Sequence, residues 1–266
     1  MHRSLNLKSL AVIVFVACGN LAPASAAITN VTLYPSYSGA FNVAGNGADA
    51  APGFSSSSWQ QSSNVKGELY IPASSLFASP VTIQSIASIS YWTNKSTTTA
   101  DPDWSLMLYT AATGVMDSAS WYHSRLNAEP YLTGTPAVTP GIWHQWSTND
   151  ALNPLRFYDA NRNGGIFGTY TDPTLTDLQA GAVTWQNNAV VDYSQEPINL
   201  FSLQTGSAWA NGFTGLVDGL TITLVNGDVA NVNLEAVPEP ASIIVWSLIG
   251  LAFGGVAWRR RRKHDA

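Results

Sequence analysis

Residues 220–234 carry the pattern that most restricts the fold of this chain. Apolar residues occupy every second position of 220–224 and of 230–234, and Asn226-Gly227 lies between the two runs. Strict alternation places the apolar side chains on one face of a strand. Asn-Gly is typical of a two-residue type I′ turn. The pattern therefore predicts an antiparallel hairpin with one face in a core and the other in water.

Short runs rich in β-branched and aromatic residues continue along the chain, separated by glycine, proline, asparagine and serine. They span residues 83–92, 104–110, 183–186, 198–204 and 215–224. These runs predict strands, and residues 55–58 and 96–99 predict surface loops. One helix is signalled, with Asp172 as its cap, Pro173 at its first position and Gly181 at its end. We expect an all-β fold, an antiparallel β-sandwich.

The first 26 residues have the organisation of a secretory signal peptide. A short basic segment precedes the apolar run 9–19, and Ala24 and Ala26 supply the small residues of a cleavage site. A run of 11 residues is too short to span a bilayer. We expect cleavage after Ala26. The mature chain then contains no cysteine, because the single one is Cys18.

The last 30 residues predict a membrane segment. Residues 241–258 form an 18-residue apolar run, which as a helix would reach about 27 Å of a bilayer core of about 30 Å. A basic cluster follows it directly: Arg259, Arg260, Arg261, Arg262 and Lys263. These cations would hold the C-terminus in the cytoplasm and leave the preceding residues outside the inner membrane.

A short motif, Val237-Pro238-Glu239-Pro240, stands immediately before this apolar run. Its prolines favour an extended segment that a membrane protease could engage. Pro-Glu-Pro, an apolar run and a basic cluster, in this order, resemble the PEP-CTERM sorting signal of Gram-negative bacteria that produce exopolysaccharide. The resemblance implies recognition by an exosortase, a membrane cysteine protease, with cleavage near Pro238, Glu239 and Pro240 and delivery to the cell surface or medium. A permanent anchor is the alternative.

The segment between the two ends is strongly acidic. Residues 27–236 contain five Lys or Arg residues against fifteen Asp or Glu residues, which gives a formal net charge of −10 where the whole chain has −5. Such a domain repels nucleic acid and anionic lipid surfaces. Neutral sugars, cations and other proteins remain as partners.

Four segments of this domain share a further pattern: 106–114, 121–125, 169–173 and 207–222. They resemble secreted domains of the concanavalin A-like, laminin-G-like jelly-roll class. In that class a late Gly-x-Val-Asp-x-Leu-Thr-Ile segment is a strand near the final hairpin, and residues 215–222 match it. The resemblance implies a jelly-roll sandwich, and the class contains lectins, glucanases and adhesion modules.

Motifs for catalysis are weak in this chain. Retaining glucanases of the jelly-roll class use a Glu-x-Asp-x-x-Glu strand, which is missing, and Asp101 and Asp103 flank a proline in a segment that predicts a turn. The chain has no Gly-x-Ser-x-Gly, His-Glu-x-x-His or P-loop sequence. We expect a non-enzymatic domain, with a polysaccharide-active hydrolase and a purely structural surface protein as alternatives.

Asp159, Asn161 and Asn163 place oxygen-bearing side chains at alternate positions before a glycine, as the first half of a calcium loop does. The twelfth position would be Tyr170 in place of glutamate, so the segment is not an EF-hand. A hairpin turn explains the same residues, and Arg162 opposes a cation. We therefore expect a turn and no cofactor, with calcium at Asp159, Asn161 and Asn163 as the alternative.

Four aromatic residues are candidates for a glycan platform: Trp143, Trp146, Trp121 and Tyr122. Aromatic faces stack on the apolar C–H side of sugar rings, while amides and carboxylates bind the hydroxyl groups. In a strand Trp143 and Trp146 would face opposite sides, so at least one of them belongs to the core. We expect an exported β-sandwich that interacts with exopolysaccharide or surface components.

Overall fold

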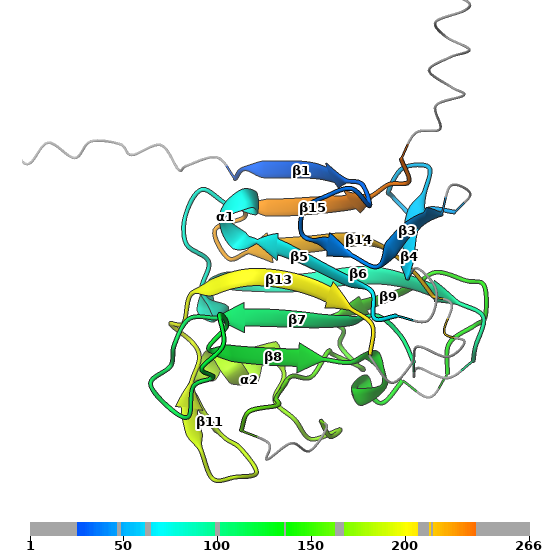
Figure 1. Ribbon diagram of the computed structural model, residues 1–266. Helices are drawn as coiled ribbons and strands as arrows, with labels where there is room; N and C mark the ends of the chain where they lie inside the picture. The colour runs from blue at the N-terminus through cyan, green and yellow to red at the C-terminus, as the bar shows by residue number, and fades with distance from the viewer. Residues whose placement is uncertain are drawn as a thin grey trace, which may run out of the picture.

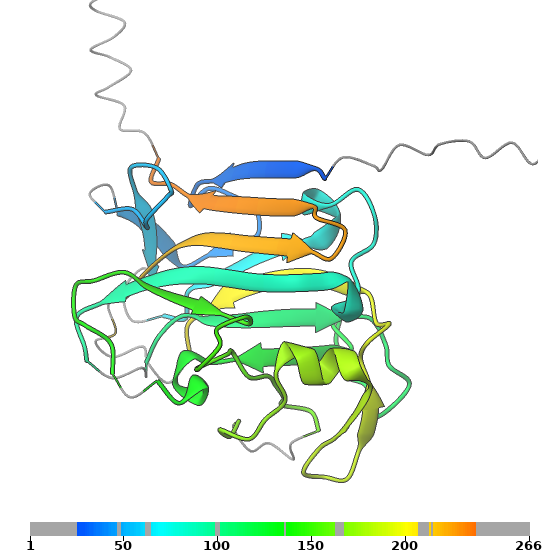
Figure 2. The same cartoon turned by 180° about the vertical axis from the view of Figure 1, so that it is seen from behind.

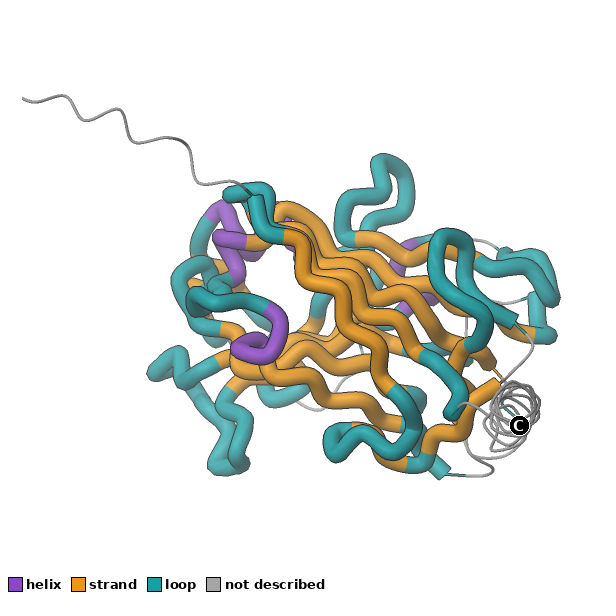
Figure 3. The backbone as a smooth tube through the Cα atoms, turned by 90° about the horizontal axis from the view of Figure 1, so that it is seen from above, coloured by secondary structure: helices purple, strands orange, loops and turns teal. Residues whose placement is uncertain are grey.

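The computed structural model describes residues 26–46, 49–61, 65–98, 102–135, 137–162, 168–206, 213 and 215–237. Residues 1–25 of the predicted signal peptide, the Pro-Glu-Pro motif, the apolar run and the basic cluster lie outside these residues. No helix in the described part is long and apolar enough to cross a membrane. Two sheets face each other, as Figures 1 and 3 show. One apolar core lies between them, and the predicted all-β sandwich is confirmed.

Sheet A, seen from its outer side in Figure 2, has seven strands. They are β1 (Ile28–Leu33), β3 (Val43–Asn46), β4 (Ser58–Gln61), β6 (Ile86–Lys95), β9 (His144–Ser147), β14 (Gly215–Leu224) and β15 (Val229–Leu234). The long strand β14 pairs along one edge with β4 and then β15, and along the other edge with β6, which pairs with β9. The first strand, β1, pairs in parallel with the last, β15.

Sheet B has six strands in the order β10-β8-β7-β13-β5-β2, all antiparallel. They are β2 (Ala40–Phe41), β5 (Glu68–Pro72), β7 (Ser105–Thr110), β8 (Ser124–Ala128), β10 (Tyr158–Asp159) and β13 (Ile198–Gln204). A separate hairpin contains β11 (Ala182–Thr184) and β12 (Val190–Asp192). The helical elements are α1 (Ala73–Leu76), α2 (Leu175–Ala180) and the 3₁₀ turns η1 (Ile83–Ser85) and η2 (Pro130–Thr133).

Alternation along the strands builds the core between the sheets. The inward side chains of β5, β7 and β13 face those of β6, β14 and β15, and all belong to one buried cluster. Three tryptophans are fully enclosed, and each indole N–H has an acceptor: Trp59 donates to Glu235 O at 2.9 Å, Trp104 to Gly215 O at 2.9 Å and Trp146 to Thr93 Oγ1 at 2.8 Å. Burial of these three large aromatic residues therefore leaves none of their indole donors unpaired.

The predicted final hairpin is present, but its turn differs from the expected one. Leu220 pairs with Val232 and Ile222 with Ala230, and all four side chains are buried. The Gly227 N–H donates to Leu224 O at 2.9 Å and Gly227 has a φ of 93°, whereas Asn226 is not among the described residues with positive φ. A type I′ turn needs positive φ at both central residues. Residues 225–227 instead form a three-residue loop that ends in a left-handed glycine.

Two further predictions from local sequence need correction. Helix α2 is capped by Thr174, whose hydroxyl accepts the Asp177 N–H, and not by Asp172; its end at Gly181 is confirmed. Residues 55–58 are not a surface loop throughout, because Ser57 and Ser58 are buried: Ser58 is the first residue of β4, and the Ser57 hydroxyl accepts the Ala236 N–H. Both errors arise because a serine, threonine or aspartate signals a cap or a loop without showing which neighbour it binds.

Candidate functional site

Five aromatic rings gather on the outer face of sheet B, and we call them the aromatic face. They are Phe41, Tyr70, Tyr109, Trp121 and Tyr122. Phe41, Tyr70 and Tyr109 come from β2, β5 and β7, whose neighbouring residues Leu69, Ile71 and Leu108 point into the core. The period of two in each strand therefore projects these three rings outward. Trp121 and Tyr122 come from the segment between β7 and β8.

The rings of the aromatic face contact one another in an unbroken series. The Trp121 indole lies 5.0 Å from the Tyr109 ring at an angle of 31°, and 5.8 Å from the Tyr70 ring, which contacts Phe41 at 6.0 Å. Trp121 is 62% exposed and Phe41 49% exposed, whereas Tyr109 below them is 2% exposed. The surface thus offers a broad apolar area on a packed support, of the kind that proteins keep for binding.

Polar groups border the aromatic face. The Tyr70 hydroxyl donates to Glu68 Oε1 at 2.9 Å, and Lys66 Nζ lies 2.6 Å from the same oxygen. Burial raises the pKa of Tyr70 far above its usual range, and the charges of its neighbours raise it further. The Tyr70 hydroxyl therefore remains a hydrogen-bond donor in ordinary buffers. On the other side the Arg125 guanidinium lies 5.6 Å from the centre of the Tyr122 ring. An amphipathic border of this type suits a ligand with both C–H faces and hydroxyl groups.

The segment that carries Trp121 is fastened by a buried arginine. Arg162 donates to Thr113 Oγ1 at 2.9 Å, to Val115 O at 3.0 Å and to Asp117 Oδ1 at 3.1 Å, and its other neighbours include Ser124. Burial acts to raise the pKa of Asp117, but hydrogen bonds from Thr113 and Gly114, together with the Arg162 charge, outweigh it and hold that pKa below its usual range. The loop before Trp121 is therefore tied to a charged group in the interior.

The segment that offered calcium as an alternative to a turn supplies this arginine. Asp159 Oδ2 lies 2.5 Å from Arg162 Nη1 and accepts the Tyr193 hydroxyl at 2.9 Å, while its Oδ1 accepts the Asn161 N–H at 2.9 Å. Both carboxylate oxygens are thus engaged, and a guanidinium stands where the pattern suggested calcium. Asn163 lies outside the described residues. Within the described ranges no group of three or more His, Cys, Asp or Glu side chains is arranged to hold a metal ion.

The four predicted platform residues lie in two places. Trp146 is buried in the core under sheet A, as the alternation argument requires for one of the pair, and Trp143 donates to Asp49 Oδ1 at 2.9 Å beside the same sheet. Trp121 and Tyr122 belong to the aromatic face on sheet B. The sequence did not single out Phe41, Tyr70 and Tyr109, since isolated aromatic residues in strands are more often core residues.

Asp103 does not reach either surface. Its carboxylate is buried 3.3 Å from Lys95 Nζ and accepts the Thr93 hydroxyl at 2.8 Å. Desolvation raises the pKa of Asp103 to about 6, although Lys95 and Thr93 oppose that shift. Asp101, its expected neighbour, lies outside the described residues. Because it is buried beside Lys95, Asp103 has a structural role in holding β6 next to the start of β7.

The C-terminal end of the sandwich is closed by two residues that follow β15. The Glu235 N–H donates to Leu33 O at 2.9 Å, and the Ala236 N–H donates to Ser57 Oγ at 2.7 Å. Val237 is exposed. The Ala236 N–H is therefore the last backbone group of the described residues for which the structure gives a hydrogen bond.

Comparison with known proteins adds one match at this point of the chain. The PEP-CTERM protein-sorting motif matches residues 236–262. This chain carries a PEP-CTERM sorting motif. The PEP-CTERM motif marks an exported protein that an exosortase sorts, and the predicted processing by this membrane enzyme is supported. The PEP-CTERM motif also implies a membrane-anchored sorting stage followed by a surface or extracellular location. A comparison with curated proteins found no match.

Proposed function

We propose that this exported protein is a non-enzymatic polysaccharide-binding β-sandwich of the concanavalin A-like, laminin-G-like class. The aromatic face is its binding surface, with Trp121 as the main stacking group. The C-terminus stays in the cytoplasm until an exosortase cuts near Pro238, Glu239 and Pro240. The sandwich then acts at the cell surface or in the surrounding exopolysaccharide.

The exposure of Trp121 on a packed aromatic support is the observation that carries this proposal. An indole that is 62% exposed leaves a large apolar area in water, which costs free energy unless a ligand covers it. The contact with Tyr109 at 5.0 Å fixes its orientation in advance, and preorganised rings lose little entropy on binding. The net charge of −10 on residues 27–236 favours neutral polysaccharides.

Substitution of Trp121 tests the proposal. Binding of residues 27–237 to an array of neutral and acidic polysaccharides would be compared for the wild type and for Trp121→Ala, with Trp143→Ala as a matched control. We expect at least about tenfold weaker binding in Trp121→Ala, on the order of 1.4 kcal/mol, and unchanged binding in Trp143→Ala. The melting temperature of each variant shows whether the sandwich is intact.

Two outcomes would count against this function. If the wild-type protein binds no polysaccharide, the domain is better described as a structural surface protein. Release of reducing sugar from any polysaccharide in the array would instead favour a hydrolase. The Glu68 carboxylate on the border of the aromatic face is engaged by Lys66 and Tyr70, an arrangement that suits support of the rings better than acid catalysis.

A further inference from the structure

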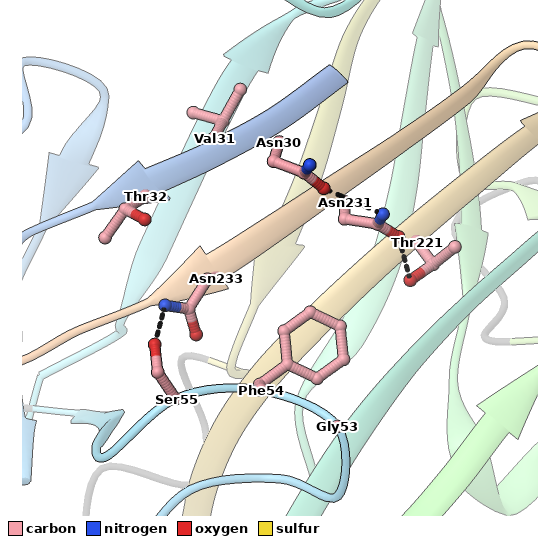
Figure 4. A pocket seen from close by; sticks show the side chains of 9 residues that line it. All are labelled: Asn30, Val31, Thr32, Gly53, Phe54, Ser55, Thr221, Asn231 and Asn233. Carbon is pink, nitrogen blue, oxygen red and sulfur yellow. Dashed lines mark hydrogen bonds between the residues drawn. The ribbon is translucent and has the colours of Figure 1, made fainter. Parts of the chain in front are cut away.

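A polar groove crosses the outer face of sheet A. It has a volume of about 590 Å³ and passes over β1, β15 and β14 and beside the loop before β4. Figure 4 shows the side chains that line it, among them three asparagines on neighbouring strands and Phe54 on the loop. None of the lining residues is titratable. The groove lies on the opposite sheet from the aromatic face.

Strand pairing places amides and hydroxyls in a row along the groove. Parallel pairing sets Asn30 opposite Asn231, and antiparallel pairing sets Thr221 opposite Asn231. The Asn231 Nδ2 donates to Asn30 Oδ1 at 3.0 Å, and the Thr221 hydroxyl donates to Asn231 Oδ1 at 3.2 Å. Because side chains alternate between the two faces of a strand, the neighbouring apolar residues point into the core and this row stays on the solvent side.

The loop that forms the second wall of the groove is fastened at both ends. The Ala51 N–H donates to Asp218 Oδ2 at 3.1 Å, and the hydroxyls of Ser55 and Ser57 donate to the Glu235 carboxylate. Phe54 lies over Gly219, where an added Cβ would approach its ring to 2.6 Å. Because Gly219 also has a φ of 65°, a glycine is required there for the ring to occupy this place.

Asn233 fastens the loop side of the groove through its amide nitrogen. Its Nδ2 donates to Ser55 Oγ at 2.7 Å and to Glu235 Oε1 at 2.9 Å, which fixes the orientation of the amide. Its Oδ1 is enclosed and accepts no hydrogen bond from the described residues. An enclosed acceptor without a donor destabilises the protein and is not open to a ligand, so Asn233 serves the groove through the hydrogen bond that holds Ser55, next to Phe54.

We propose that this groove is a second saccharide site, which takes a neutral hexose unit. The Phe54 ring covers the C–H face of the sugar, the amides of Asn30 and Asn231 bind hydroxyls, and Asn233 holds the loop that carries Phe54. The volume falls within the range of small-molecule sites, about 300–1,000 Å³. This inference rests on the proposed polysaccharide-binding function. With sites on opposite sheets, one molecule bridges two polysaccharide chains.

Binding stoichiometry tests the second site. A set of neutral gluco-, manno- and galacto-oligosaccharides would be titrated calorimetrically into residues 27–237 of the wild type, Trp121→Ala, Asn233→Leu and the double variant. Asn149→Leu, at an exposed asparagine outside the groove, is the matched control. We expect two equivalents for the wild type and the control, one for each single variant and none for the double variant. Saccharide should also shift the side-chain amide signals of Asn30 and Asn231 in Trp121→Ala.

The remaining outcomes separate this inference from the proposed function. One equivalent in the wild type that disappears in Trp121→Ala would overturn the groove site and leave the aromatic face standing. One equivalent that disappears only in Asn233→Leu, with an unchanged melting temperature, would support the groove and overturn the aromatic face. No binding of any oligosaccharide to the wild type would overturn both.

Discussion

The backbone nitrogen of Ala27 lies 2.7 Å from Oδ1 of Asp228, so the residue that follows the predicted cleavage site is held by the loop between β14 and β15. The Ala27 carbonyl accepts the Val229 N–H at 2.8 Å, and β1 begins at the next residue. Cleavage after Ala26 would therefore spare the whole strand. The same cleavage would convert the Ala27 amide into an ammonium group beside a carboxylate.

This contact predicts a pH-dependent contribution to the stability of the mature chain. Hydrogen bonds from Ala27 and Asn226 lower the pKa of Asp228, so its share of stability is present above the unfolded pKa of 3.8 and lost as pH falls through the folded value. The terminal ammonium loses its charge as pH rises through about 8. We expect Asp228→Asn to lower the melting temperature between these limits and to have a smaller effect above about pH 9, where the amine is neutral and only the hydrogen bonds remain.

A chain that begins two residues earlier, at Ser25, provides the control for that experiment, because it keeps the Ala27 amide and lacks an ammonium group at that position. In this longer chain, the change in melting temperature caused by Asp228→Asn should not become smaller as the pH rises through about 8. Equal responses of the two chains at every pH would contradict the ion pair. Intact mass of the exported protein would show independently whether residues 1–26 are removed.

Arg162 should be among the most sensitive residues of the sandwich. Arg162→Met leaves the buried Asp159 carboxylate without its cation, which typically costs about 3–5 kcal/mol. Urea unfolding would measure the loss, with Arg156→Met as a control, since Arg156 is half-buried and donates to the Asp172 carbonyl. We also expect weaker polysaccharide binding, because Arg162 fastens the loop before Trp121. A loss below about 1 kcal/mol, the range of exposed ion pairs, would contradict this assignment.

Asp218 should give the sandwich a stability component that decreases as pH rises. Its carboxylate accepts the Leu234 N–H at 2.9 Å and the Gly219 N–H at 2.7 Å, yet burial raises its pKa to about 6. Because the pKa is raised in the folded state, Asp218 contributes its full stabilisation below about pH 3.8 and loses it as the pH rises through about 6. The difference in unfolding free energy between the wild type and Asp218→Asn should therefore shrink from about pH 4 to about pH 7. A constant difference would argue against the raised pKa.

The boundary between the sandwich and its sorting signal can be tested by truncation. A chain that ends at Val237 keeps the contacts of Glu235 and Ala236 and should melt at the same temperature as a chain that ends at Ala266. A chain that ends at Leu234 loses the acceptor of Trp59 and the partners of Ser57. We expect a loss of about 3 kcal/mol or more. Equal stability of all three chains would show that residues 235–237 contribute nothing.

Local sequence predicted those features of the fold that depend on neighbouring residues. The strands 198–204 and 215–224 have the predicted bounds, because β-branched alternation and flanking turn residues are local signals. The hairpin turn was predicted with the wrong type, because Asn-Gly is compatible with two loop lengths and the register of β14 with β15 decides between them.

The sequence by itself determined the all-β class, the acidic charge of the domain and the sorting motif, because each depends on composition, order or alternation. Only the tertiary structure decided which aromatic residues act together. Trp121 contacts Tyr70, and Tyr70 contacts Phe41, because β2 and β5 belong to one sheet. Trp143, a candidate for the same platform as Trp121, lies beside the other sheet. Only the tertiary structure likewise showed that Asp159 pairs with Arg162 in the interior and that Asn30 lies next to Asn231. Residues distant in sequence become neighbours only through strand pairing and burial.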